Sequence, residues 1–273
     1  MTRSSAVIVE FHSGANLQAA LSSFREDGVS DIVVVNNGSD NLSARCDLSG
    51  VTLANTGQNL GYGRGVNRGA ALTQKTEFLC VSNPDVVVHA GALAALEGYL
   101  DEHADVGIVG PTIVTQSGLP YPSVRVFPSA LVAAMHAVCA PWWPGNPWTT
   151  RYRSPRADGG VDWVSGAMFL IRRDLFEALG GFDERYFMFA EDMDLCWRAQ
   201  RQGSRVAWCA AATITHVEGA SRAAAPREMT RAHHRSAMRF EWTTSSGWRR
   251  LGVPVALALL WLRMRVALVR RRA

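Results

Sequence analysis

Lysine is almost absent from this 273-residue chain, and the arginines that replace it are unevenly placed. Lys75 is the one lysine among 28 basic residues, and seven arginines fall within positions 249–273, where no acidic residue occurs. The rest of the chain holds 21 basic and 24 acidic residues, so the net charge of +4 is a property of the tail. This pattern argues against a nucleic-acid-binding body and favours a local anionic partner for the tail.

Paired cysteines are also missing from the sequence, and the N-terminal pattern predicts no secretory leader. The five cysteines are odd in number and widely spaced, and no two of them have the spacing of zinc ligands. This usage predicts reduced thiols in a cytosolic protein. The N-terminus has only a short apolar run before Glu10, which predicts a first strand and not a signal peptide. No internal repeat or low-complexity segment occurs.

A long uncharged run is lacking as well. The most apolar stretch, 251–262, has twelve residues without charge, whereas a helix needs about twenty to span a bilayer. Its flanking arginines, with Trp248 and Trp261, predict an amphipathic helix lying on an anionic membrane surface. The alternative is a buried C-terminal helix that packs within a homodimer.

The composition that is present, 48% apolar and 19% charged, is that of a globular protein. Apolar strand patterns alternate with helical patterns, and this predicts an α/β fold with a mostly parallel sheet covered on both faces. Ligands of such sheets bind at the carboxyl ends of the strands. The predicted strands are 6–11, 31–41, 51–56, 77–88 and 106–111, and the predicted helices are 16–27 and 91–103.

Two polar residues follow predicted strands and have the chemistry of metal ligands. Asp85 follows the rigid Pro84 at a break in the strand 77–88, where its carboxylate suits Mg²⁺ or Mn²⁺. His216 follows a later strand, and imidazole suits Mn²⁺ in mixed sites. Taken alone, Asp85 is more readily explained as a turn residue and His216 as a structural histidine.

The run NLGYGRGVNRG, 59–69, contains four glycines. It is neither a Rossmann fingerprint nor a P-loop, because the glycine spacing differs and no Gly-Lys-Ser/Thr follows. One interpretation is a loop whose backbone approaches a nucleotide diphosphate closely. The other is a helix start with glycines that allow close packing.

Three carboxylates lie within four positions in FMFAEDMDLCWR, 187–198. A helix that begins near Ala190 would place Glu191, Asp194 and Arg198 on one face and Asp192 elsewhere. Acids in a first turn are favoured by the helix dipole without any other function. The same dipole keeps a general base ionised, and the aromatic residues before it would suit a sugar pocket.

In this order, VVVNNGSDN, NLGYGRGVNRG, SNPD, GGFDERYFMFAEDMDLCWR and THVEGAS resemble the family 2 glycosyltransferases, which have the GT-A fold. The resemblance covers roughly residues 5–245. It implies a nucleotide-binding half at about 1–115, an acceptor half at about 116–245, and a basic tail at 246–273. It also implies inverting sugar transfer with Mg²⁺ or Mn²⁺ as cofactor.

The resemblance assigns roles to single residues. Asp192 corresponds to the catalytic base, and Asp85 and His216 to the metal ligands. Donor-nucleotide binding is implied for Phe11, Asn36, Asn59, Gly61, Asn67, Asn83 and Asp85. Acceptor binding is implied for Arg125, Trp163, Ser165, Gly166 and Glu191. One position departs from the family, which has aspartate where Asn36 stands, so an acceptor for the pyrimidine N3–H loses its charge there.

The middle segment, with YPSVRVFPS and PWWPGNPWTTRYR, is similar to the branch of the family that transfers L-rhamnose. This implies dTDP-L-rhamnose as donor, a lipid-linked N-acetylglucosaminyl diphosphate as acceptor, and a peripheral place on the cytoplasmic face of the cell membrane. The segment 139–153 is either a lid or part of the acceptor site. Another hexosyl- or galactofuranosyltransferase and a catalytically inactive membrane scaffold are the alternatives.

Overall fold

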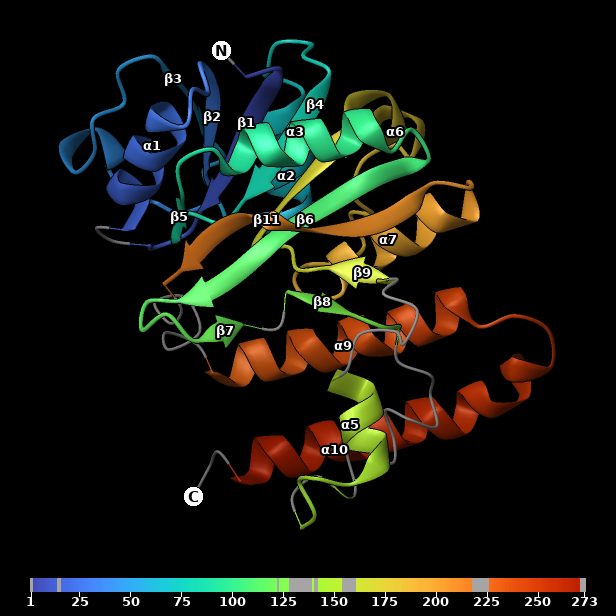
Figure 1. Ribbon diagram of the computed structural model, residues 1–273. Helices are drawn as coiled ribbons and strands as arrows, with labels where there is room; N and C mark the ends of the chain where they lie inside the picture. Colours follow the sequence, from blue (N-terminus) through green and yellow to red (C-terminus); the bar gives the residue numbers. More distant parts are fainter. Residues whose placement is uncertain are drawn as a thin grey trace.

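A computed structural model describes residues 2–13, 16–121, 123–127, 139, 142–153, 161–217 and 226–270. A nine-stranded sheet runs through the main body in the order β3-β2-β1-β4-β10-β6-β11-β5, with β7 paired to β6 (Figure 1). The strands are β1 Ser4–Glu10, β2 Asp31–Asn36, β3 Val51–Asn55, β4 Phe78–Ser82, β5 Val86–Val88, β6 Val106–Thr115, β7 Pro120–Tyr121, β10 Met168–Arg172 and β11 Arg205–His216. The pair β8 Val124–Arg125 and β9 Trp163–Val164 forms a second, small sheet.

The strand directions divide the sheet into two halves. The N-terminal strands β1 to β4 run parallel to one another, and β6 runs parallel to β11. Between these halves β10 runs antiparallel to both β4 and β6. The mostly parallel sheet predicted from the sequence is confirmed, and β10 is the strand whose direction the sequence pattern does not define.

Helices cover both faces of the sheet because consecutive strand residues point to opposite sides. On one face Ala6 and Ile8 of β1 pack with α1 (Asn16–Glu26) and α3 (Ala92–Glu102). On the other face Val7 and Val9 pack with α2 (Tyr62–Ala70), α6 (Arg173–Ala178) and α7 (Glu191–Arg201). The predicted helices 16–27 and 91–103 are confirmed to within a residue or two at their ends.

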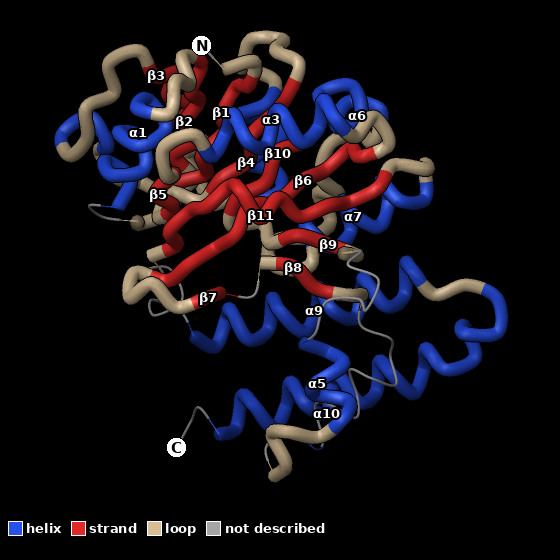
Figure 2. The backbone as a smooth tube through the Cα atoms, in the orientation of Figure 1, coloured by secondary structure: helices blue, strands red, loops and turns tan. Residues whose placement is uncertain are grey.

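A helical layer lies below the sheet (Figures 1 and 2). It contains α9 (Pro226–Thr244), the 3-10 turn η2 (Gly247–Gly252) and α10 (Val253–Arg270), and α9 and α10 pack together as an antiparallel pair. The short helix α5 (Pro147–Arg153) overlaps α10 in the orientation that Figures 1 and 2 share. Much of the proline-rich middle segment, including 128–138, lies outside the described residues.

The C-terminal helix is longer than its uncharged run. Arg250–Val269 is a 20-residue stretch with a mean hydropathy of 1.7, of which 11% is buried, and its length and composition would allow it to cross a membrane. The predicted stretch 251–262 ends before Arg263, but apolar residues continue beyond Arg263 and Arg265. The count of twelve residues therefore understates the apolar length of the helix.

Candidate active site

Strand ends bring Asp85 and His216 together although 131 positions separate them. Asp85 lies between β4 and β5, and His216 is the last residue of β11, which pairs with β5 so that His216 stands opposite Val86. The Val217 N–H donates to the Asp85 carbonyl over 2.8 Å. The result is a contact of 3.1 Å between His216 Nε2 and Asp85 Oδ1, with both side chains mostly buried.

This pair fits two neighbouring ligands of an octahedral cation. Metal–ligand distances of about 2.1 Å place adjacent ligands about 3.0 Å apart, close to the 3.1 Å observed. The Asn83 amide nitrogen lies 3.5 Å from the same imidazole nitrogen. Among the described residues no group of three or more His, Cys, Asp or Glu side chains gathers here or elsewhere. Water and substrate oxygens would therefore have to complete the coordination of a metal.

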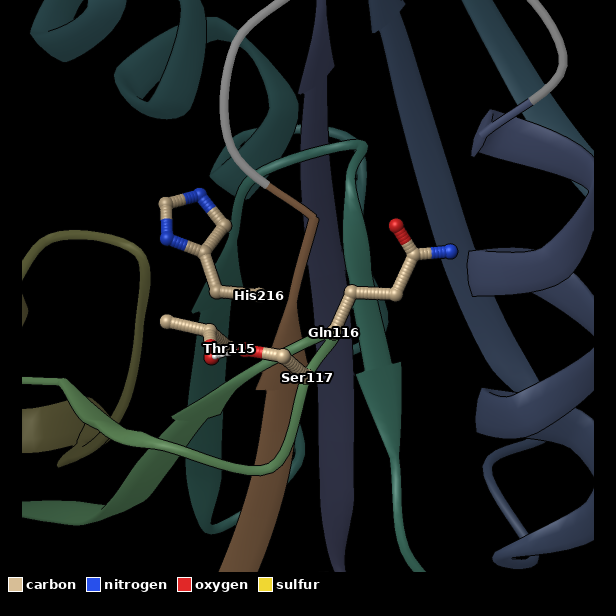
Figure 3. A pocket seen from close by; sticks show the side chains of 4 residues that line it. All are labelled: Thr115, Gln116, Ser117 and His216. Carbon is tan, nitrogen blue, oxygen red and sulfur yellow. Dashed lines mark hydrogen bonds between the residues drawn. The ribbon is translucent and has the colours of Figure 1, made fainter.

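An open cleft of about 450 Å³ lies beside His216 (Figure 3). It is lined by Thr115, Gln116 and Ser117 of the turn after β6 and by His216. The Thr115 and Ser117 hydroxyls are hydrogen-bonded over 2.9 Å, and the ring of Tyr121 packs edge-on against His216. Polar groups thus surround the side of the imidazole that faces the cleft.

The second part of the site is the start of α7. The helix begins at Glu191, and the two residues before it, Phe189 and Ala190, have positive φ values of 68° and 62°. Such conformations cost of order 1–3 kcal/mol for non-glycine residues and occur often at functional sites. Asp192 accepts a hydrogen bond of 2.8 Å from the Gly166 N–H at Oδ2. A strained turn and a backbone donor therefore define where this carboxylate lies.

Burial controls the charge of the two adjacent acids. Burial, followed by the charge of Asp192, raises the pKa of Glu191 to about 8. Burial also raises the pKa of Asp192, and the hydrogen bonds from Gly166 and Met193 and the charge of Arg125 oppose that rise. One Glu191 oxygen is buried without a hydrogen-bond partner among the described residues. The donors around Asp192 thus favour its ionised form against the effect of burial, whereas the surroundings of Glu191 favour its protonated form.

The third carboxylate of the sequence motif has a structural role. Asp194 is buried and forms an ion pair of 2.7 Å with Arg198, one turn along α7. Arg198 also donates to the carbonyls of Leu179 and Gly181 in the preceding turn. These bonds fasten α7 to the Gly180–Gly181 turn and keep Asp194 away from Asp192.

The predicted acceptor residues gather around Asp192. Arg125 and Trp163 are paired across β8 and β9, and the guanidinium lies 5.4 Å from the ring centroid of Trp163. Ser165 donates its N–H to Ser123, and Gly166 follows with the bond to Asp192. An aromatic face with a cation above it therefore stands beside the carboxylate pair.

Four of the predicted donor residues lie at strand ends, two beside His216 and two at the ends of β1 and β2. Asn83 and Asp85 lie at the metal-type pair, and Phe11 lies at the end of β1, with its ring 4.3 Å from that of His12. Asn36 lies at the end of β2, but its amide nitrogen donates to Asp40 and Asn55 and its oxygen accepts from Gly38. Asn36 is thus largely engaged in shaping its own loop.

Asn37, which the sequence analysis did not select, links the loop after β2 to the glycine-rich run. Its side chain donates to the carbonyl of Gly61 and accepts from the Leu60 N–H. Asn59 in turn accepts from the Gly61 N–H over 2.9 Å. The sequence signal for Asn37 was its place beside Asn36 after a buried strand.

The glycine-rich run is a helix from Tyr62 onward, preceded by a loop at 59–61, which agrees with the second interpretation; an approach of this loop to a nucleotide stays a prediction. A Cβ at Gly65 would lie 2.9 Å from Val9, and one at Gly69 would lie 2.5 Å from Val7. The structure does not support Asn67 as a nucleotide contact, because its amide is bonded to both the N–H and the carbonyl of Phe182. Gly61, with φ of 86°, lies against the Phe187 carbonyl.

Tyr62 is a site residue that sequence reasoning missed. It is the first residue of α2, and its hydroxyl donates to the Gly166 carbonyl over 2.7 Å. The charges of Glu191 and Asp192 act on it, although burial is the main reason that its pKa lies well above the ordinary value. Its only sequence signal was an aromatic residue within a glycine-rich run.

Comparison with known sequences identifies the family. The model of the glycosyltransferase-like family 2 matches residues 5–234. The N-acetylglucosaminyl-diphospho-decaprenol L-rhamnosyltransferase of Mycobacterium tuberculosis is 36% identical over 263 residues, which cover 89% of this chain and 85% of that protein. A low-salt glycan biosynthesis hexosyltransferase of Haloferax volcanii is 25% identical over 78% of this chain and 66% of its own length.

Solved structures show the same fold. GalNAc-T7 with UDP, GalNAc and Mn²⁺ superposes with a TM-score of 0.62 at 17% identity, over 79% of this chain and 43% of that chain. The mannosyltransferase of Pyrobaculum calidifontis with GDP-mannose and Mn²⁺ gives 0.60 at 14% identity, over 97% and 75%. At these identities the likeness concerns the fold, and it confirms the GT-A architecture. The family match, the relatives and the fold agree, and the chain belongs to glycosyltransferase family 2.

Proposed function

We propose that this glycosyltransferase transfers L-rhamnose from dTDP-L-rhamnose to a polyprenol-linked N-acetylglucosaminyl diphosphate, with inversion at the anomeric carbon. The observation that supports it most is the 36% identity to a rhamnosyltransferase of that acceptor class over 89% of the chain. The arrangement of Asp192 near Arg125 and Trp163 supplies a base and a sugar-binding surface for such a reaction.

Asp192 is the general base of the proposed reaction. It accepts the proton of an acceptor hydroxyl while that oxygen forms a bond to the anomeric carbon of the donor sugar. The bond from the anomeric carbon to the nucleotide diphosphate breaks in the same step, so a β-L-rhamnosyl donor gives an α-L-rhamnoside. Burial raises the pKa of the Asp192 carboxyl, and the Gly166 N–H and the charge of Arg125 oppose that rise and so favour the ionised base.

Asp85 and His216 are the residues that would hold a divalent cation, Mg²⁺ or Mn²⁺. Such an ion supplies positive charge to the departing diphosphate. Two of the structural relatives contain Mn²⁺, and the 3.1 Å contact between Asp85 and His216 fits adjacent ligands. Treatment with EDTA is expected to abolish transfer, and Mn²⁺ or Mg²⁺ to restore it. Full transfer in EDTA would contradict the metal site.

The C-terminal helix is the proposed contact with the membrane that carries the acceptor. Its exposed residues Val255, Leu259, Leu262, Val266 and Val269 recur every three or four positions and form one apolar stripe. Arg263 and Arg265 flank this stripe, as expected for a helix lying on an anionic leaflet. A peripheral place on the cytoplasmic face of the cell membrane follows from this arrangement together with a nucleotide-sugar donor.

The test is transfer from radiolabelled dTDP-L-rhamnose to a synthetic N-acetylglucosaminyl-diphospho-lipid. We expect Asp192→Asn to lower the rate by about 10²–10⁴-fold and to leave the Kd for dTDP unchanged. Asp105→Asn, at a surface ion pair with Arg205, is the matched control and should keep full activity. No transfer by the wild-type protein from this donor, with transfer from another nucleotide sugar, would replace the rhamnosyl assignment by another hexosyl assignment.

A further inference from the structure

Tyr62 touches both backbone segments that present Asp192. Its hydroxyl donates to the carbonyl of Gly166 over 2.7 Å, and the N–H of the same Gly166 donates to Asp192 Oδ2 over 2.8 Å. Gly166 therefore binds Tyr62 through its carbonyl and Asp192 through its N–H. Within the described part of the chain, the Gly166 N–H is the only hydrogen-bond donor to Asp192 from outside α7.

The backbone of Tyr62 makes the second connection. Its N–H donates to the Phe187 carbonyl over 3.0 Å, and Gly61 lies so close to that carbonyl that no larger residue would fit. Phe187 begins the segment that continues through the strained Phe189 and Ala190 into α7. The same tyrosine thus fixes the entrance to the helix that carries Asp192.

The surroundings of Tyr62 leave it little freedom. Its ring meets Phe182 edge-on, with the ring centroids 6.2 Å apart. At the other end of the contact, a Cβ on Gly166 would lie 3.2 Å from Asp192 Oδ2 and 3.4 Å from Asp192 Cβ. The phenol, the glycine and the carboxylate therefore form one closely packed series of groups.

We infer that Tyr62 is a positioning residue, which holds Gly166 and the Phe187 segment so that the Asp192 carboxylate stays at its hydrogen-bonded place. This inference rests on the proposed role of Asp192 as the base. Tyr62 does not take part in proton transfer, because burial and the nearby acids keep its hydroxyl protonated. A small displacement of a catalytic group lowers a rate strongly, by as much as about 10²-fold for 1 Å.

The charged and titratable groups that act on Asp192 define what a displacement would change. Glu191 is its neighbour on α7, Arg125 faces it from β8, and Tyr62 faces it from α2. The Gly166 N–H favours the ionised carboxylate. Loosening this bond raises the pKa of Asp192, and the acid limb of the rate profile then moves to higher pH.

The experiment compares Tyr62→Phe with Tyr99→Phe, a distant control whose ring stacks on His103. We expect Tyr62→Phe to lower kcat by about 10- to 100-fold with the donor KM within about twofold of wild type. The acid limb of its kcat profile should move upward by about half a pH unit. Tyr99→Phe should match wild type in kcat, in donor KM and in the pH profile of kcat. Gly166→Ala should reproduce the changes seen in Tyr62→Phe.

A second readout needs no substrate. In protein labelled with ¹³C at the aspartate carboxyl carbons, with Asp192→Asn to assign the signal, Tyr62→Phe should raise the titration midpoint of Asp192. An unchanged kcat, or a loss of kcat that accompanies a lower Tm without any change in the Asp192 titration, would overturn the positioning role. Retained transfer by Asp192→Asn would instead overturn the proposed role of Asp192 as the base. The effect of Tyr62→Phe on the titration of Asp192 does not depend on that result.

Discussion

At the scale of single residues, the site depends on two adjacent acids whose surroundings differ. Asp192 receives N–H donors from Gly166 and Met193, whereas one oxygen of Glu191 is buried without a partner among the described residues. Hydrogen bonds to a carboxylate favour its ionised form, and burial without them favours the protonated form. The two side chains are therefore suited to different tasks: Asp192 to the proposed role of proton acceptor, and Glu191 to that of a neutral hydrogen-bond donor.

A pH-dependent stability follows for Glu191. Its pKa is about 8 in the folded protein and about 4.3 in an unfolded chain. As the pH rises between these values the unfolded state releases a proton that the folded state keeps, so the free energy of unfolding falls. Glu191→Gln removes this loss, and its Tm relative to wild type should increase from pH 5 to pH 8. Thermal unfolding across this range measures it, with Glu102→Gln on the exposed face of α3 as control; parallel curves would contradict the shift.

At the scale of elements, α2 is placed by its glycines. Gly65 and Gly69 let the helix approach β1 closely, and the position of α2 in turn sets that of Tyr62. A helix start displaced from the sheet would carry the Tyr62 hydroxyl away from Gly166. The close packing of α2 is therefore part of the active site, although none of its glycines contacts a reacting group.

Two glycine substitutions separate packing from helix propensity. Gly69→Ala in α2 would place a Cβ 2.5 Å from Val7 and 2.8 Å from Val35, and overpacking of this kind costs about 1–3 kcal/mol. Gly98→Ala in α3 meets nothing within 4 Å and should stabilise by about 0.5–1 kcal/mol. Urea unfolding of both variants tests the difference. Equal stability of the two would show that α2 has room to move away from the sheet.

The sequence predicted strands and helices well where the pattern involves residues that are close together along the chain. Apolar runs identify β1, β2 and β4. The contact of Asp85 with His216 was implied only by family resemblance, because it depends on β11 returning beside β5. Tyr62 was missed for the same reason: its partner Gly166 lies 104 positions away, and nothing in either segment alone points to the other.

At the scale of the whole molecule, α9 and α10 form a layer beside the catalytic body (Figure 1). Ser236 and His233 of α9 contact Met188 and Phe189, just before α7, the helix of the proposed base. Toward the other side, α9 packs on α10, which exposes its apolar stripe. A membrane-bound α10 would therefore hold the acceptor side of the body near the surface where a lipid-linked sugar is presented.

Binding to lipid vesicles tests this arrangement with the complete chain. We expect binding to vesicles that contain phosphatidylglycerol, and weaker binding to phosphatidylcholine alone, because the arginines around the stripe attract anionic head groups. Arg263→Gln with Arg265→Gln should weaken binding by about 30-fold, since each arginine near the surface contributes about 1 kcal/mol. Arg68→Gln, on the exposed face of α2, is the control and should bind like wild type.

An alkaline carbonate wash distinguishes a helix that lies on the membrane surface from one that spans the membrane. Alkaline carbonate should release the protein from vesicles if α10 lies on the surface, where Arg263 and Arg265 stay in the head-group region. Retention after this wash would support insertion of the whole Arg250–Val269 stretch, which has the length to span. In that case the two arginines would lie within the apolar layer, where each costs about 2.5–3.5 kcal/mol. This cost is why we expect the surface position and release by carbonate.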